Sequence, residues 1–161
     1  MLIDVIQKLI TRNENYNIRL NICGSGPEFD VLNSKIRTEN LCNIIKLSGF
    51  QNRNEILINY QNSDCFLLSS HYETFGVVLI EAMSCGLPFI STNCGGPSDI
   101  CNKSVGVILN ENSIDDFVIA IEKNIIHNNN FESKIIREFA IKNFSPIVIT
   151  KKIIREAFKI Y

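Results

Sequence analysis

The stretch Ser69–Gly96, SSHYETFGVVLIEAMSCGLPFISTNCGG, decides how the whole sequence is interpreted. A short apolar strand at Cys65–Leu68 leads into a polar loop that holds Glu73, and a helix is expected to begin near Gly76. Glu81 then lies more than one turn inside that helix. The first turn of a helix offers unpaired backbone N–H groups and a partial positive charge, which suit a diphosphate, whereas carboxylates accept hydrogen bonds from sugar hydroxyls. We therefore expect a site for a ligand that is both phosphorylated and rich in hydroxyls.

The rest of the chain alternates between strand and helix patterns. Apolar, β-branched runs predict strands at 18–23, 43–48, 65–68, 88–92 and 105–109. Helices are expected at 1–12, 27–40, 54–62, 76–86, from 113, at 131–143 and at 146–161, with one helical turn after Pro97 and with Pro27 as the first residue of its helix. This alternation predicts an α/β fold, a Rossmann-like three-layer sandwich with a mostly parallel sheet. One domain, 1–161, is expected, with 146–161 as a C-terminal helix.

The polar and glycine-rich loops all follow predicted strands. They are Gly24–Gly26, Gly49–Gln51, Ser69–Gly76 and Asn93–Gly96. Ligands of open parallel sheets bind beyond the carboxyl ends of the strands. We therefore expect these loops to meet at one edge of the sheet.

Composition excludes several classes of protein. The formal net charge of −1 over 161 residues gives no electrostatic reason to expect a nucleic-acid partner. No apolar run approaches the roughly 20 residues of a membrane span, and the amphipathic N-terminus does not resemble a signal peptide. The six cysteines form no C-x-x-C pair, which favours reduced cysteines and a cytoplasmic location. No metal site is expected.

These motifs together resemble the C-terminal, donor-binding half of a family-4 glycosyltransferase with the GT-B fold. The similarity runs through nearly the whole chain, from a G-x-G-x loop at Gly24–Pro27 to Y-x-x-S-D-x-F-L-L-S-S at Tyr60–Ser70. It continues through E-x-F-G-x-x-x-x-E at Glu73–Glu81 and E-A-M-S-C-G-L-P at Glu81–Pro88, and ends in the Gly95-Gly96 turn. A lone G-x-G is a weak signal, whereas the ordered set is a strong one.

The resemblance implies a role for each matching residue of the helix start. Glu73 would contact hydroxyls of the donor sugar and is the expected catalytic residue, and Glu81 would hold the ribose hydroxyls of the nucleotide. The backbone N–H groups of Val77 and Val78, just after the Phe-Gly pair, would hold the diphosphate.

The resemblance also assigns residues in the neighbouring loops to donor binding. Phe50 and Gln51 would lie near the base, and Gly24 and Gly26 would let the backbone approach the donor closely. The Phe75-Gly76 pair completes the expected donor-binding set, with Phe75 favoured as a packing residue. No cofactor or metal is implied, and the nucleotide diphosphate sugar is a co-substrate.

The sequence also departs from the family pattern. Family members carry a strand with a Gly-Arg pair, followed by a Lys, ahead of the helix that matches residues 1–12, and these cations neutralise the diphosphate. That strand lies in the middle of the family's sheet, between the strands that match Ile18–Cys23 and Cys65–Leu68. We therefore expect one half of a GT-B fold that lacks its first strand and the N-terminal acceptor domain.

The leading hypothesis is sugar transfer from a nucleotide diphosphate sugar to an acceptor, with retention of configuration, in glycan, polysaccharide or glycolipid synthesis. Two alternatives stay open within the family: a non-catalytic donor-binding subunit that needs a separate acceptor-binding domain or chain, and an inactive truncated glycosyltransferase. A doubly wound regulatory domain outside the family is a further alternative. The sugar, the nucleotide, the acceptor and the oligomeric state are not specified by the sequence.

Overall fold

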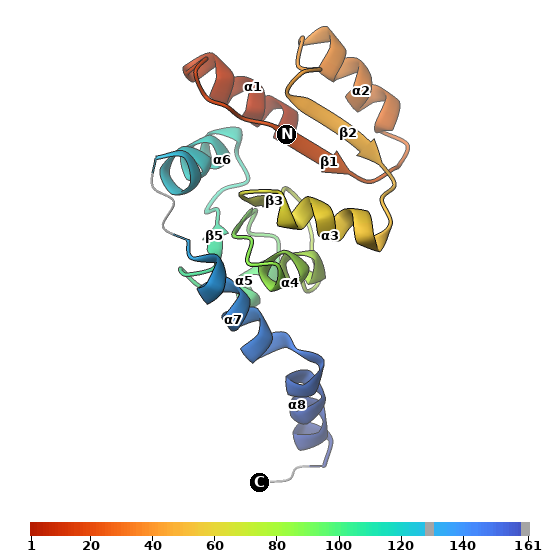
Figure 1. Cartoon of the computed structure of the whole chain (residues 1–161), viewed down its shortest axis with the longest axis vertical. Helices are drawn as coiled ribbons and strands as arrows, with labels where there is room; N and C mark the ends of the chain where they lie inside the picture. Colours follow the sequence, from red (N-terminus) through yellow and green to blue (C-terminus); the bar gives the residue numbers. More distant parts are fainter. Residues whose placement is uncertain (128–130, 159–161) are drawn as a thin grey trace.

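The computed structural model describes residues 1–127 and 131–158, in which helices and strands alternate (Figure 1). In chain order the elements are α1 (Leu2–Arg12), β1 (Leu20–Cys23), α2 (Phe29–Thr38), β2 (Ile45–Gly49), α3 (Arg53–Gln61), β3 (Phe66–Leu68), α4 (Val77–Ser84), β4 (Phe89–Ser91), α5 (Pro97–Ile100), β5 (Gly106–Ile108), α6 (Ile114–Ile121), the π-helix η1 (Glu122–Ile126), α7 (Ser133–Phe144) and α8 (Pro146–Phe158).

The strands form two parallel sheets rather than one. β1 pairs with β2, with Leu20 opposite Ile45, and β4 lies between β3 and β5, with Ile90 opposite Leu67 and Val107. The predicted α/β class and parallel pairing are confirmed. The expected gap is also found, because β1 and β3 share no ladder in the described part of the chain.

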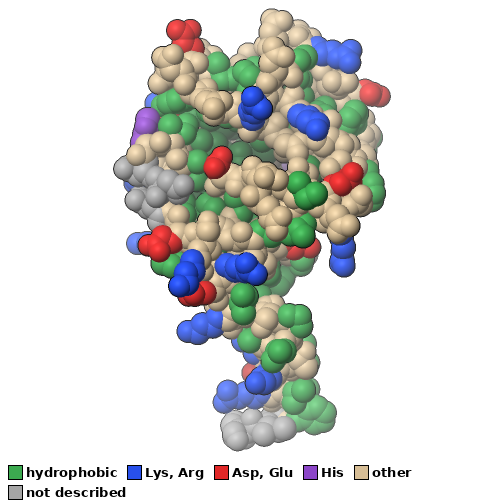
Figure 2. Space-filling model, viewed as in Figure 1, with side chains coloured by type: hydrophobic (Ala, Val, Ile, Leu, Met, Phe, Trp, Pro, Cys, Tyr) green, Lys and Arg blue, Asp and Glu red, His purple; other side chains and the backbone are tan. Residues whose placement is uncertain are grey.

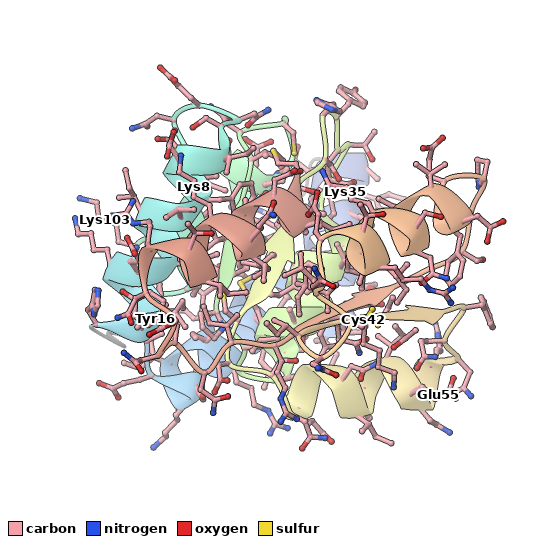
Figure 3. All side chains as sticks on the ribbon, turned by 90° about the horizontal axis from the view of Figure 1, so that it is seen from above. Lys8, Tyr16, Lys35, Cys42, Glu55 and Lys103 are labelled. Atoms are coloured by element: carbon pink, nitrogen blue, oxygen red, sulfur yellow. The ribbon has the colours of Figure 1, made fainter. Side chains whose placement is uncertain are left out.

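Helices cover the strands on both sides, as a sandwich requires. Seen from above, α1 and α2 lie side by side on one face of β1 and β2, and α3 lies on the opposite face (Figure 3). Ion pairs join α1 to both of its helical neighbours: Lys35 of α2 to Asp4, and Lys8 to Asp115 of α6, each at 2.5 Å. α1 therefore bridges the half of the molecule that holds β1–β2 and the half that holds β3–β5.

The core consists of two clusters of buried side chains. The first gathers residues of α1, α6 and β4 together with Ile36 of α2 and Ile45 of β2, so it spans both sheets. The second lies between α4, β4 and α7, around Phe89 and Ile136. α7 packs on α4, whereas α8 extends away from the strands and buries no residue among those described (Figure 1).

Element types follow the sequence closely, with two differences. Pro27 does not open α2. It lies in a turn that is closed by a hydrogen bond from the Phe29 N–H to the Gly26 carbonyl (3.1 Å). Pro27 is the second residue of this turn, which is a position that proline prefers. Glu28 is the N-cap of α2. The second difference is the π-helix η1, which extends α6 and which no periodicity in the sequence indicates. Of the predicted helix at 146–161, residues 159–161 lie outside the described part.

No helix among residues 1–127 and 131–158 is both long and apolar enough to cross a membrane.

Candidate functional site

The loop that carries Glu73 is fixed against the Gly95-Gly96 turn at the carboxyl ends of β3 and β4. The Glu73 N–H donates to the Cys94 carbonyl, and the Gly96 N–H donates to the Glu73 carbonyl, each at 2.9 Å. A Cβ atom on Gly96 would lie 2.4 Å from the Cα of Phe75 and 2.6 Å from the carbonyl oxygen of Thr74. Only glycine fits there, which explains the Gly-Gly pair in the sequence.

The start of α4 lies directly beside the Glu73 carboxylate. Gly76, the N-cap residue, has the left-handed conformation that glycine adopts easily (φ 84°). Glu73 Oε1 accepts hydrogen bonds from the backbone N–H groups of Phe75 (3.3 Å) and Gly76 (3.2 Å). The loop backbone therefore holds this carboxylate in place, immediately ahead of the helix.

The N–H groups of Val77 and Val78 belong to the first turn of α4. The intrahelical hydrogen bonds begin with the N–H groups of Leu79 and Ile80, which both donate to Gly76 O. The first two N–H groups of a helix have no carbonyl acceptor within the helix and point out of its end. Val77 is 57% exposed, so this end of α4 opens to the surface.

Glu81 lies on the exposed side of α4 and has Tyr60 of α3 as its partner. Tyr60 Oη donates to Glu81 Oε2 at 3.3 Å and lies at the same distance from the Val78 carbonyl. Burial of the phenol, together with the nearby Glu81 carboxylate, raises the pKa of Tyr60, so it stays protonated as a donor. Sequence reasoning quoted Tyr60 only as part of a motif and did not assign it to the site.

The loops after β1 and β2 form a second group. The Gly24 N–H donates to the Gly49 carbonyl at 2.7 Å, which joins these loops, and Gly26 is exposed nearby. Phe50 is 79% exposed. The Gln51 side chain folds back on its own loop, where Nε2 donates to the carbonyls of Ser48 (3.0 Å) and Phe50 (3.2 Å).

The two groups of loops lie on opposite sides of the gap between β1 and β3, and α3 connects them. Asn21 of β1 donates to the side chain of Asn59 at 3.1 Å, and the next residue of α3, Tyr60, contacts Glu81. Within each sheet the strands run parallel, so the loops of each group lie at the carboxyl edge of their own sheet.

Phe75 has a packing contact. Its ring lies edge-on to Phe144 at the end of α7, with centroids 6.4 Å apart and planes at 80°. The ring therefore anchors the Glu73 loop to α7, in agreement with the packing role expected for it.

Over the described residues, no three His, Cys, Asp or Glu side chains are grouped as a metal site would require. The expectation that no metal or cofactor takes part stays a prediction.

Comparisons with known proteins identify the family of this chain. Residues 1–141 match the family model of glycosyl transferases group 1. A 2-deoxystreptamine N-acetyl-D-glucosaminyltransferase from Niallia circulans is 37% identical over 95 residues, which cover 59% of this chain and 24% of the relative. The phosphatidylinositol N-acetylglucosaminyltransferase GPI3 subunit of Saccharomyces cerevisiae is 25% identical over 94% of this chain and 34% of the relative.

Solved structures show the same fold. The lipopolysaccharide outer core galactosyltransferase WaaB superimposes with a TM-score of 0.83 at 25% identity, over 98% of this chain and 44% of that protein. HepE of Anabaena, solved in complex with UDP and glucose, gives a TM-score of 0.80 at 20% identity over 98% of this chain and 44% of its own. The chain thus spans less than half of each relative named here. By its sequence and its fold, the chain belongs to the group 1 glycosyl transferases, as a C-terminal-type domain of the GT-B fold.

Proposed function

We propose that this chain binds the nucleotide diphosphate sugar donor of a glycosyl transfer at the carboxyl ends of its strands. The observation that carries this proposal is the arrangement around the start of α4. A carboxylate fixed by backbone N–H groups (Glu73) lies beside exposed helix-end N–H groups (Val77 and Val78) and an exposed carboxylate, Glu81, one turn further on.

The start of α4 would bind the diphosphate. A helix N-terminus carries about half a positive charge, which stabilises the negative charge that develops on a departing diphosphate. Glu73 Oε1 is occupied by the N–H groups of Phe75 and Gly76, and we assign Oε2 to a hydroxyl of the donor sugar. As a catalytic residue, Glu73 would act by holding the sugar in its reactive orientation.

The nucleoside would lie further along α4 and toward β2. Glu81, with Tyr60 donating to one of its oxygens, keeps acceptor capacity for the ribose hydroxyls. The exposed Phe50 ring would stack on the base, and Gln51 would lie beside it. Gly24 and Gly26 would let the backbone approach the ligand without a side chain in between.

Calorimetric titration with UDP, GDP and ADP, and with their sugar conjugates, tests this function. Glu81→Ala should weaken nucleotide binding about tenfold to hundredfold, because a hydrogen bond to a charged group contributes about 1.5–3 kcal/mol. Glu156→Ala serves as the matched control, since Glu156 is an exposed helical glutamate on α8, away from the strand ends. No binding of any nucleotide or sugar conjugate would contradict the proposal.

A second variant examines how Glu81 is held. Tyr60→Phe keeps the ring that packs against Phe66 (centroids 5.6 Å apart) and removes only the hydroxyl. We expect it to weaken nucleotide binding about threefold to tenfold, within the contribution of one hydrogen bond. If binding is unchanged, Glu81 does not depend on Tyr60 for its orientation.

The complete reaction would need a separate acceptor-binding domain or chain, because Glu73 and α4 account only for the donor side. A retaining sugar transfer that persists in EDTA, measured with the chain joined to such a domain, would support a metal-independent transferase. Nucleotide binding without transfer under any partner would favour the alternative of a donor-binding subunit. The six free cysteines suit a reducing compartment, and we propose the cytoplasm, where subcellular fractionation would find it.

A further inference from the structure

The last turn of α7 lies beside the loop that carries Glu73. α7 packs on α4, the helix whose first turn forms the candidate diphosphate site, and Phe144 is the last residue of α7. Beyond it the chain leaves the body of the molecule: Ser145 is extended (ψ 150°), and α8 projects where the molecule narrows (Figure 2). The end of α7 therefore borders the candidate site, although no sequence motif points to it.

Phe144 connects the exposed ring of Phe75 to the core. Phe75 is 44% exposed, whereas Phe144 is partly buried and packs against the second core cluster. Phe144 also lies edge-on to Phe139, five residues earlier in α7, with ring centroids 6.0 Å apart and planes at 68°. Edge-to-face ring pairs have a preferred geometry and contribute more than the area they bury. The three rings thus form a row that leads from α7 to the Glu73 loop.

The backbone of Phe75 in turn holds the Glu73 carboxylate. Its N–H donates to Glu73 Oε1 at 3.3 Å, beside the hydrogen bond from Gly76 at 3.2 Å. The Gly95-Gly96 turn blocks the opposite side, because a Cβ atom on Gly96 would lie 2.4 Å from the Phe75 Cα. The turn thus holds the backbone of Phe75 and Phe144 holds its ring, and the orientation of the carboxylate depends on both.

We propose that Phe144 is a positioning residue for the donor sugar, and that it acts through Phe75 on the Glu73 carboxylate. The inference rests on the proposed donor-binding function, in which Glu73 Oε2 accepts from a sugar hydroxyl. The nucleotide itself would be held elsewhere, by Glu81 and by the N–H groups at the start of α4. Removal of the Phe144 ring should therefore weaken binding of the sugar and leave binding of the nucleotide unchanged.

Hydrogen exchange of the ligand-free chain tests the contact itself. Phe144→Leu removes the ring and keeps an apolar side chain at the end of α7. We expect the amides of Phe75 and Gly76, which hold the carboxylate, to exchange faster in this variant by about threefold or more. The amides of Glu73 and Gly96, which join the loop to the turn, should change less and serve as an internal reference.

Calorimetric titration separates the sugar from the nucleotide. UDP, GDP and ADP are each compared with their glucose conjugates. For the pair that binds, we expect Phe144→Leu to weaken binding of the sugar conjugate about threefold to tenfold, the contribution of one hydrogen bond, and binding of the nucleotide by less than about twofold. An equal loss for both would show a merely structural role and overturn the proposal.

Two further variants control for stability. Ile136→Val removes a methyl group from the same core cluster, where Ile136 is fully buried, and should leave the exchange at Phe75 and Gly76 unchanged. Phe75→Leu removes the other ring of the pair. Because the two rings form one contact, the double variant of Phe75→Leu and Phe144→Leu should exchange no faster than either single variant.

Unchanged exchange at Phe75 and Gly76 in Phe144→Leu would overturn the proposal, as would an equal acceleration in Ile136→Val. Additive effects of the two ring variants would overturn it as well. Faster exchange without binding of any nucleotide would contradict the donor site and leave the link from Phe144 to Glu73 standing.

Discussion

β4 and β3 have similar sequences but very different surroundings. Phe89 and Ile90 of β4 are 0% exposed, because β4 has a strand on each side and helices on both faces. Phe66 and Leu67 of β3 are only half-buried, although they are equally apolar. Leu20 and Ile22 of β1, on the other side of the gap between β1 and β3, are half-buried too. The burial of a parallel strand is therefore set by its neighbours and not by its own residues.

The largest expected effect compares the two phenylalanines directly. Phe89→Ala should lower the free energy of unfolding by about 3–5 kcal/mol, because it leaves a cavity in the second core cluster. Phe66→Ala should cost less than half as much, since Phe66 is half-buried beside the gap between β1 and β3. Urea unfolding measures both. Equal losses would show that β3 is as well packed as β4.

Two glycines extend the comparison from strands to loops. Gly96→Ala should destabilise the protein by about 1–3 kcal/mol or more, because the added Cβ would meet the backbone of Phe75 and Thr74. Gly26→Ala on the β1 side meets nothing within 4 Å and should change stability by less than about 1 kcal/mol. A loss of UDP binding by Gly26→Ala without a loss of stability would support its place in the donor site.

The smallest expected effect concerns the ion pair that joins α1 to α2. The hydrogen bond from Lys35 lowers the pKa of Asp4 below its ordinary 3.8. The pair therefore stabilises the fold above pH 3.8, and its contribution is lost as the pH falls through the lower value in the folded protein. At neutral pH, Asp4→Asn should cost about 0.2–1 kcal/mol, since both side chains are partly exposed.

Urea unfolding of the wild type and Asp4→Asn across this pH range checks the sign. The difference between the two proteins should shrink as the pH is lowered below 3.8. A double-mutant cycle with Lys35→Met isolates the pair, and the same cycle on Lys8 and Asp115 measures the contact of α1 with α6. A difference that stays constant down to low pH would contradict the assignment to this ion pair.

Much of the fold followed from the sequence because its signals are local. The Gly86–Pro88 stop and the Ser113 cap define helix ends through turn and capping chemistry, and Ser113 Oγ accepts from the Asp116 N–H at 3.0 Å as expected. The start of α2 was predicted two residues too early, at Pro27, because proline suits both a tight turn and the first turn of a helix. Only the hydrogen bond between Gly26 and Phe29 shows which of the two is present.

The site was predicted less completely than the fold. Their spacing around a helix start was enough to predict the places of Glu73, Gly76 and Glu81, because such a spacing is also a local property of the sequence. The contact of Tyr60 with Glu81 joins residues 21 positions apart on different helices, and no periodicity carries that information.

By itself, the sequence determined the order of strands and helices, the two carboxylates that flank the start of α4, and the glycines that its loops need. Only the tertiary structure decided that α1 joins the two halves of the molecule and that α3 connects the two groups of loops. The reason is physical: hydrophobic periodicity, capping and turn chemistry act between residues close in sequence. Burial and strand pairing depend instead on which distant segments lie on either side.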